Sequence, residues 1–308
     1  EYIENPATVS FPWSMIDKIT PRPDASVKKM LEDAGFTDTE SIVTSKNTYV
    51  APFVNAEEAQ YLVIENAFPN GRPALENAGV MFTSRETVEK VERMKVCTCL
   101  NPLHTALAVY GCLLGYTKIS DEMKDADLVK LVEIIGYKEG LPVVTDPGIL
   151  SPKKFIDEVL QIRVPNPFMP DTPQRIACDT SQKLSIRFGE TIKEYMASSE
   201  LDVKSLKFIP MVQAGWCRYL LGVDDELNAF TVSPDPMYEE LAGKLAGVKV
   251  GESCDVHAVL SPILSDAKIF GVNLYEAGLG EYVESIFAEL IAGKGAVRET
   301  LKKHLAEA

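Results

Sequence analysis

Helical periodicity dominates the sequence from Arg85 onward. In nearly every segment of this part, apolar residues recur three or four positions apart, the spacing that places them on one face of an α-helix. The segments with this pattern are 86–95, 102–114, 126–135, 152–161, 190–198, 238–245, 276–291 and 296–306. The sequence therefore predicts a mainly α fold for residues 85–308.

The first 84 residues have a different character. Short β-branched or aromatic runs predict strands at 42–45 and 61–64, and 26–34 predicts a short helix. Residues 9–12 are expected to be extended, and the prolines that bracket 14–21 favour a one-turn helix or a loop there. The Pro, Asn and Gly residues of 68–73 indicate a loop. We place a domain boundary near Ser84, which gives an α/β part (1–84) and a helical part (85–308).

Composition limits the possible partners. A chain of 308 residues with 46% hydrophobic and 25% charged residues can bury a full core. Its net charge of -14 argues against nucleic acid and anionic membranes, which require a basic face. The longest strongly apolar run, 106–116, is too short to span a bilayer, so no transmembrane segment is predicted. Small soluble substrates fit this chain better.

The six cysteines bear on the cellular compartment. They are widely spaced, and the chain opens on Glu1 without a charged and apolar leader, so reduced thiols in the cytoplasm are expected. The non-methionine start also suggests a piece of a longer protein. The cysteines are Cys97, Cys99, Cys112, Cys178, Cys217 and Cys254.

One short stretch gathers side chains suited to catalysis. Glu92 and Lys95 precede an apolar helix, and Asn101 and His104 stand at its start. Asn101 is predicted as the N-cap, with Pro102 at the first helical position. Because Asn101 and His104 are three residues apart, they can share one face of the first turn.

Other interpretations of this stretch are weaker. Cys97, Cys99 and His104 could ligate zinc, but their spacing matches no established site and a fourth ligand is missing, so we expect no metal. Cys99 and His104 could form a thiol nucleophile and its base, although the cysteines fit core packing better. His257 and His304 are predicted to be structural or exposed.

A second group of charges recurs every four residues, at Arg175, Asp179, Lys183 and Arg187. In a continuous helix these residues would form one stripe, either a solvated salt-bridge face or a receptor for an anion. Two or three converging cations suit a carboxylate. The spacing alone leaves both interpretations open.

Three passages resemble the mannitol dehydrogenase family, the polyol-specific long-chain dehydrogenases that include fructuronate and tagaturonate reductases. The first passage is Lys95 with Asn101-x-x-His104 and the upstream Glu92. The others are 11–21, which contains Asp17, and 166–183, which contains Arg175 and Lys183. The family usually places four residues between lysine and asparagine, whereas five stand here, at 96–100. A bulge at the helix junction could absorb the extra residue.

The resemblance implies a fold and a cofactor. The fold would be a helical dehydrogenase domain, similar to the C-terminal domain of 6-phosphogluconate dehydrogenase, preceded by a small remnant of a Rossmann-type domain. The family uses NAD or NADP and no metal. No Gly-rich dinucleotide turn is present, so most cofactor-binding residues are expected upstream of Glu1, and the chain alone is expected to be inactive. The choice between NAD and NADP stays open, as does that between monomer and dimer.

The resemblance also implies roles for residues in carbonyl reduction. Lys95 would exchange the proton, which requires its pKa to fall from about 10.4 toward about 7 to 8. Asn101 would donate to the oxyanion and His104 would orient a hydroxyl. Glu92 would relay protons, unless it only forms an i, i+3 salt bridge with Lys95.

The substrate is expected to be a sugar acid or a polyol. Asp17, Arg175, Lys183 and Arg187 are the candidate substrate-binding residues. The run 181–183 with Arg187 resembles the sugar-acid reductases, which favours D-mannonate and D-fructuronate. The alternatives are mannitol 2-dehydrogenase or another polyol dehydrogenase, and a non-catalytic helical interaction module on the same scaffold.

Overall fold

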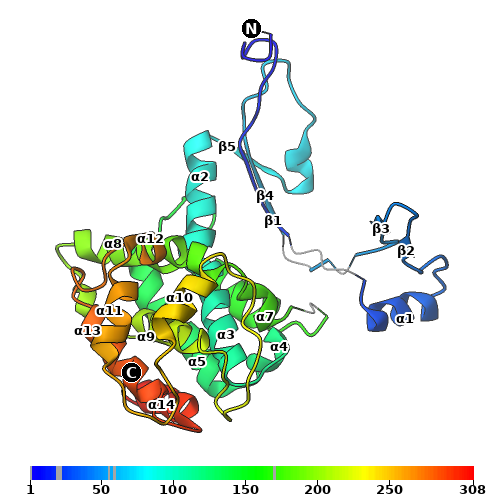
Figure 1. The fold of residues 1–308 in the computed structure, drawn as a ribbon. Coiled ribbons are helices and arrows are strands. Elements are labelled where there is room, and N and C mark those ends of the chain that lie inside the picture. Colours follow the sequence, from blue (N-terminus) through cyan, green and yellow to red (C-terminus); the bar gives the residue numbers. More distant parts are fainter. Residues whose placement is uncertain (1, 19–22, 55, 58–59, 169–170) are drawn as a thin grey trace.

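The computed structural model describes residues 2–18, 23–54, 56–57, 60–168 and 171–308. The helices after residue 85 form one body, and the small sheets precede them in the sequence (Figure 1). The mainly α fold class predicted from the sequence is confirmed. The division into two domains at Ser84 stays a prediction, although the five strands found in the described residues all lie before Ser84.

The larger sheet has three strands in the order β1-β4-β5. Strand β1 (Ser14–Asp17) is antiparallel to β4 (Tyr61–Glu65), which is parallel to β5 (Met81–Thr83). The prediction of a helix or loop for 14–21 is therefore wrong for 14–17, and 19–21 lie outside the described residues. Met15 and Asp17 are buried, and their neighbours in the strand are exposed, because pairing with β4 imposes a two-residue period that flanking prolines do not reveal.

A smaller unit stands apart from the helical body (Figure 1). It contains α1 (Ala25–Asp33) and the hairpin of β2 (Ile42–Val43) and β3 (Tyr49–Val50). The helix and the first strand lie where the sequence predicts them, within two residues, and β3 was not predicted. The side chain of Asp24 caps α1 by accepting from the backbone N–H of Ser26.

One long helical element connects the sheet with the helical body. It comprises α2 (Arg85–Met94), the π-helical segment η2 (Lys95–Cys99) and α3 (Asn101–Leu113). The span 85–113 is long and apolar enough to cross a membrane by length and composition, but 83% of its most apolar window is buried inside the protein. Such burial is typical of the core helix of a folded domain, and α3 has that position.

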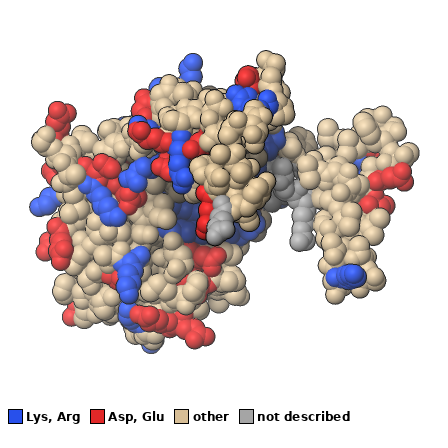
Figure 2. Space-filling view, turned by 90° about the horizontal axis from the view of Figure 1, so that it is seen from above, with Lys and Arg blue, Asp and Glu red and all other residues tan. Residues whose placement is uncertain are grey.

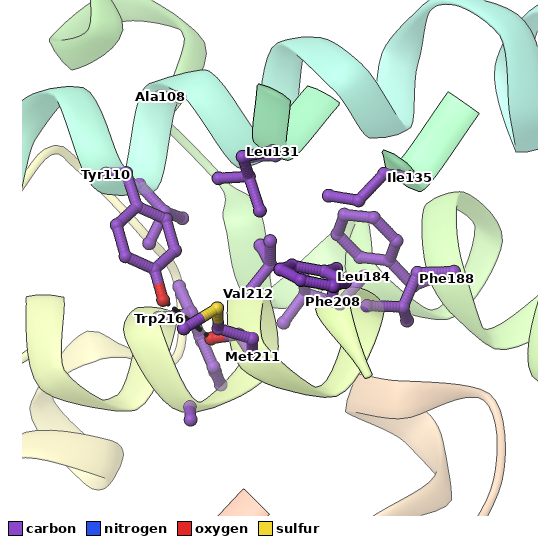
Figure 3. Close-up of a cluster of buried hydrophobic side chains, with 14 of the residues drawn as sticks. Ala108, Tyr110, Leu131, Ile135, Leu184, Phe188, Phe208, Met211, Val212 and Trp216 are labelled. Atoms are coloured by element: carbon purple, nitrogen blue, oxygen red, sulfur yellow. Dashed lines mark hydrogen bonds between the residues drawn. The ribbon is translucent and has the colours of Figure 1, made fainter. Parts of the chain in front are cut away.

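The core of the helical body forms around α3, α9 (Phe208–Tyr219) and α13 (Gly280–Leu290). Every residue of α9 is buried, and Figure 3 shows its Phe208, Val212 and Trp216 side chains within the apolar cluster. The sequence did not predict α9, because a helix buried on all sides lacks the amphipathic period and Pro210 lies in its first turn.

The remaining helices enclose this core. They are α4 (Ile119–Glu122), α5 (Ala126–Glu133), α6 (Pro152–Glu158), α7 (Pro173–Ile176), α8 (Glu190–Ala197), α10 (Tyr238–Leu245), α11 (Val256–Leu264), α12 (Ala267–Phe270) and α14 (Ala296–Ala306). Three further π-helical segments are η3 (Ile134–Gly140), η5 (Val159–Arg163) and η7 (Ser185–Gly189), and the 3-10 helices are η1 (Leu75–Ala78), η4 (Leu141–Val143), η6 (Thr180–Gln182) and η8 (Val203–Ser205). Acidic and basic side chains are interspersed over the face seen in Figure 2, so the negative net charge does not prevent local basic groups.

Candidate active site

A cavity of about 280 Å³ lies where β1 meets the helical body. It brings together seven of the eight side chains predicted to act in catalysis or substrate binding. Its lining consists of Ile16, Asp17, Lys18, Lys95, Leu100, Asn101, His104, Asp171, Arg175, Ile176, Lys183 and Arg187. These residues come from distant parts of the sequence, so the fold joins passages that only the family resemblance had connected.

The junction between α2 and α3 determines where the central residues point. Lys95 begins the π-helical turn η2, whose wider ring takes up an additional residue, as the bulge hypothesis anticipated. The predicted N-cap is wrong by one position. Leu100 is the N-cap, with φ -130°, and Asn101 is the first residue of α3. The side chain of Asn101 therefore caps nothing and, within the described part of the chain, makes no hydrogen bond.

Asp17 pairs directly with Lys95. The Nζ of Lys95 lies 2.8 Å from Oδ1 of Asp17 and donates to the carbonyl oxygen of Ile16 at 3.4 Å. Asp17 is only 2% exposed. Burial alone would raise the pKa of this carboxyl, but the hydrogen bonds and charges of Arg163 and Lys95 outweigh it and lower the pKa. Asp17 is thus a carboxylate whose two oxygens are already engaged by cations.

Arg163 is a residue of this site that the sequence did not reveal. Its guanidinium donates to Asp17 with Nη1 at 2.5 Å and to Glu57 with Nε at 2.8 Å, and all three residues are buried. The backbone carbonyl of Glu57 accepts from the Nζ of Lys18. Arg163 ends a π-helical segment and its partners are distant in sequence, so no local spacing could have identified it.

His104 is neutral near pH 7. Burial, above all, lowers its pKa to about 4; Asp171 opposes this effect, and the nearby arginines add to it. A neutral imidazole has one donor and one acceptor nitrogen, so it can orient a hydroxyl group. His104 and Asn101 lie on one face of the first turn of α3, as their spacing predicted.

The predicted helical stripe of charges is not a continuous helix. Asp179 has φ 53°, which separates α7 from η6, and η7 begins only at Ser185. Arg175, Lys183 and Arg187 nevertheless line the same cavity, whereas Asp179 is not part of its lining. The three cations therefore converge as the anion-receptor interpretation requires, but the loop and short helices bring them together, and a continuous helix does not.

The three cations differ in how far they are already neutralised. Arg175 forms a bidentate pair with Asp171, with Nε to Oδ1 at 2.7 Å and Nη2 to Oδ2 at 2.5 Å. Lys183 donates to the carbonyl of Cys178, and burial followed by the charge of Arg187 lowers its pKa. Among these cations, Arg175 therefore has the least unsatisfied positive charge.

Arg187 has only a neutral partner. Its Nη1 donates to the hydroxyl of Thr105 at 2.6 Å, and within the described residues it has no ion-pair partner. Burial lowers its pKa to about 10. A half-buried guanidinium without a carboxylate is costly unless an anion joins it, so an anion in the cavity would stabilise Arg187.

Glu92 lies outside this arrangement. Glu92 is exposed and does not line the cavity. Lys95 pairs with Asp17 and does not form the i, i+3 salt bridge with Glu92. A relay through Glu92 has no support from this geometry and stays a prediction.

The thiols and the other two histidines show no arrangement of a nucleophile with its base in the described part of the chain. Burial raises the pKa of Cys97 to about 11 and that of Cys99 to about 12, so both thiols are protonated at neutral pH. His257 pairs with Glu284 and His304 with Glu289, away from the cavity.

Residues 87–286 match the family model described as the mannitol dehydrogenase C-terminal domain. The chain belongs to the mannitol dehydrogenase family. This result confirms the resemblance inferred from the three sequence passages. The matched region begins three residues after the capping residue Ser84 and contains all the cavity residues that follow β1 and Lys18.

Two curated relatives illustrate the range of this similarity. D-mannonate oxidoreductase of Thermotoga maritima is 59% identical over 307 residues, which cover 98% of this chain and 56% of the relative. Polyol:NADP oxidoreductase of Gluconobacter oxydans is 31% identical, over 80% of this chain and 46% of the relative. The chain spans about half the length of these relatives. That it is a piece of a longer protein stays a prediction.

The fold also matches a solved enzyme complex. Mannitol 2-dehydrogenase of Pseudomonas fluorescens, solved with NAD and D-mannitol, superposes with a TM-score of 0.75 at 26% identity. The match covers 98% of this chain and 56% of that one.

The described residues contain no cradle for the phosphates of a dinucleotide. Such a cradle needs a strand, a Gly-rich turn and a helix, but β5 passes into α2 through Ser84 alone. Gly278 precedes α13 and Gly280 is its first residue, and a Cβ added at Gly280 would collide with the ring of Tyr275, at a distance of 2.4 Å. This turn is closed by packing, so the described part of the chain does not fit the phosphates of the cofactor.

Proposed function

We propose that this chain provides the catalytic and substrate-binding cavity of a nicotinamide-dependent oxidoreductase that interconverts D-mannonate and D-fructuronate. The observation that carries the proposal is the convergence of Lys95, Asn101 and His104 with Arg187 in one cavity. The 59% identical relative bears the name D-mannonate oxidoreductase, which supports the same choice.

The polar side chains have distinct tasks in this proposal. Lys95 exchanges a proton with the substrate oxygen, and Asp17 holds its ammonium group in place. The amide of Asn101 donates to the same oxygen as negative charge develops there. Neutral His104 orients a neighbouring hydroxyl. Together these groups stabilise the alkoxide and control its proton.

The carboxylate of the substrate would bind Arg187 and Lys183. Both cations line the cavity wall, and neither has a carboxylate partner in the described residues. Arg175 is already paired with Asp171, so its contribution would be smaller. A neutral polyol would leave the charge of Arg187 uncompensated, and this favours a sugar acid over mannitol.

NAD or NADP would accept or supply the hydride. The solved relative from Pseudomonas fluorescens contains NAD, and the Gluconobacter relative is named for NADP, so both cofactors belong in the assay. The cytoplasmic location inferred from the reduced cysteines, the absence of a metal and the restriction of partners to small molecules stay predictions.

A paired assay tests the proposal. The full natural protein that contains this chain should be given fructuronate and fructose, each with NADH and with NADPH. We expect fructuronate to have the higher kcat/KM. Preference for fructose would instead indicate a mannitol 2-dehydrogenase, and no turnover of either substrate would indicate a non-catalytic interaction module.

A further inference from the structure

Four side chains of alternating charge form a chain behind the cavity. In order they are Lys95, Asp17, Arg163 and Glu57. Arg163 and the two carboxylates are each less than 5% exposed, whereas the side chain of Lys95 is 19% exposed and reaches the cavity. Arg163 and Glu57 are therefore linked to the cavity through Asp17 and Lys95, which both line it.

We propose that Arg163 is a positioning residue that fixes the orientation and sets the proton affinity of Lys95 through Asp17. The proposal deepens the proposed function, because it concerns the group assigned there as the acid and base. Arg163 does not line the cavity, so it would act without touching substrate.

The geometry shows how Arg163 holds the carboxylate. Its Nη1 donates to Oδ2 of Asp17 at 2.5 Å and its Nη2 to Oδ1 at 3.2 Å. This fork fixes the plane of the carboxylate, so Oδ1 faces the Nζ of Lys95 at 2.8 Å. On its other side Arg163 is held by Glu57, at 2.8 Å from both Nε and Nη2. Rotation of Asp17 would break at least one of these contacts.

The charges explain the effect on the proton. If Lys95 were the single cation beside buried Asp17, their ion pair would strongly stabilise the ammonium form. Arg163 shares the negative charge of Asp17 and adds a positive charge behind it, and both effects make it easier for Lys95 to release a proton. Glu57 opposes this effect by compensating part of the charge of Arg163.

Other charged groups that face the cavity can also affect the proton of Lys95. Lys18 comes from the chain after β1, His104 from α3, and Asp171 and Arg175 from the region of α7. Lys183 and Arg187 complete the lining. None of these residues bonds to Asp17, so a substitution of Arg163 or Glu57 acts on the pair of Lys95 and Asp17 through direct contacts and on His104 only through its charge at a distance.

Competitive acetylation measures the effect without substrate or cofactor. The 308-residue chain is treated with trace acetic anhydride between pH 6 and 11, and mass spectrometry gives the pH at which Lys95 reaches half its maximal labelling rate. Exposed Lys153 serves as the internal reference. We expect Arg163→Met to raise this pH by about one unit or more, and Glu57→Gln to lower it.

The opposite directions expected for the two shifts in the labelling pH of Lys95 distinguish an electrostatic role of Arg163 from a merely structural one. If both substitutions only loosened the site, Lys95 would approach the behaviour of Lys153 in both variants. Shifts in the same direction, or no shift, would overturn the proposal. Arg163→Lys keeps the positive charge, so the labelling pH of Lys95 should shift less in this variant than in Arg163→Met. If Arg163→Met does not fold, the downward shift of Glu57→Gln still decides.

The same data are independent of the proposed reaction. Opposite shifts together with an inactive full natural protein would support the positioning role and refute the function. An active protein whose variants lack the opposite shifts would support the proposed function and refute the positioning role of Arg163.

Discussion

Lys95 and Asp17 form an ion pair of 2.8 Å that joins the helical body to the first strand of the sheet. The pair places the central amine of the cavity against a carboxylate that comes from a different sequence passage. Because Asp17 is buried and also bound by Arg163, it is a fixed support for Lys95. The position of the amine therefore depends on the contact between the sheet and the helical body.

Removal of this amine should abolish most of the turnover. In the full natural protein, Lys95→Ala should reduce kcat by ~100-fold to 10,000-fold, the usual effect of losing a general acid or base. Cofactor affinity should change little. Steady-state kinetics across pH checks the prediction, with Lys153→Ala as the control because Lys153 lies on the surface of α6. Near wild-type turnover of Lys95→Ala at every pH would assign the proton transfer to another group.

The cations should contribute unequally to binding of the acid. Arg187→Met should raise KM for fructuronate by about ten-fold to a hundred-fold, because a charge-assisted contact contributes about 1.5 to 3 kcal/mol. Arg175→Met should have a smaller effect, since Asp171 already neutralises Arg175. KM for fructose should hardly change in either variant. Equal losses on the acid and on fructose would show that Arg187 does not receive the carboxylate.

Local patterns in the sequence predicted much of the helical body. Helices α10 and α14 have the predicted bounds, because each is amphipathic and begins and ends at a change of pattern. The sequence analysis did not predict α11, which has Pro262 in its interior, or β5, which is only three residues long. Tertiary burial determined these elements more than local propensity did.

Without the family resemblance, the sequence could place site residues together only where they share a local pattern. Asn101 and His104 stand on one helical turn, so their spacing placed them together. The contacts of Arg163 with Asp17 and Glu57 span long sequence separations and have no periodic pattern. The family resemblance identified Asp17, but only the fold shows that its charge is directed at Lys95.

Gly189 should tolerate no side chain. A Cβ there would lie 2.2 Å from the carbonyl oxygen of Phe270 and 3.0 Å from the Cα of Gly271, both of which are backbone atoms. Gly189→Ala should therefore destabilise the protein by about 1 to 3 kcal/mol, the usual cost of overpacking. Gly243→Ala in α10 is the matched control, because its Cβ meets nothing within 4 Å and alanine should stabilise the helix by roughly 0.5 to 1 kcal/mol. Urea unfolding of both variants tests this contrast, and an unchanged stability of Gly189→Ala would contradict the packing of η7 against α12.

Glu122 should make stability fall as the pH rises. It is fully buried, and within the described residues neither carboxyl oxygen has a hydrogen-bond partner. Burial, followed by the negative charges of Asp125 and Asp171, raises its pKa to about 9. The ordinary value is 4.5, so between these two pH values the unfolded chain releases a proton that the folded protein keeps. The stability contributed by this group is complete below pH 4.5 and is lost progressively up to about pH 9.

Glu122→Gln should remove this pH dependence, because glutamine cannot ionise. We expect the melting temperature of the variant relative to wild type to rise between pH 5 and pH 8, by an amount that corresponds to roughly 2 to 4 kcal/mol. Differential scanning calorimetry at matched ionic strength provides the measurement. Glu133→Gln, on the exposed side of α5, controls for the change in net charge. A difference between Glu122→Gln and wild type that stays constant from pH 5 to pH 8 would show that Glu122 does not retain its proton in the folded protein.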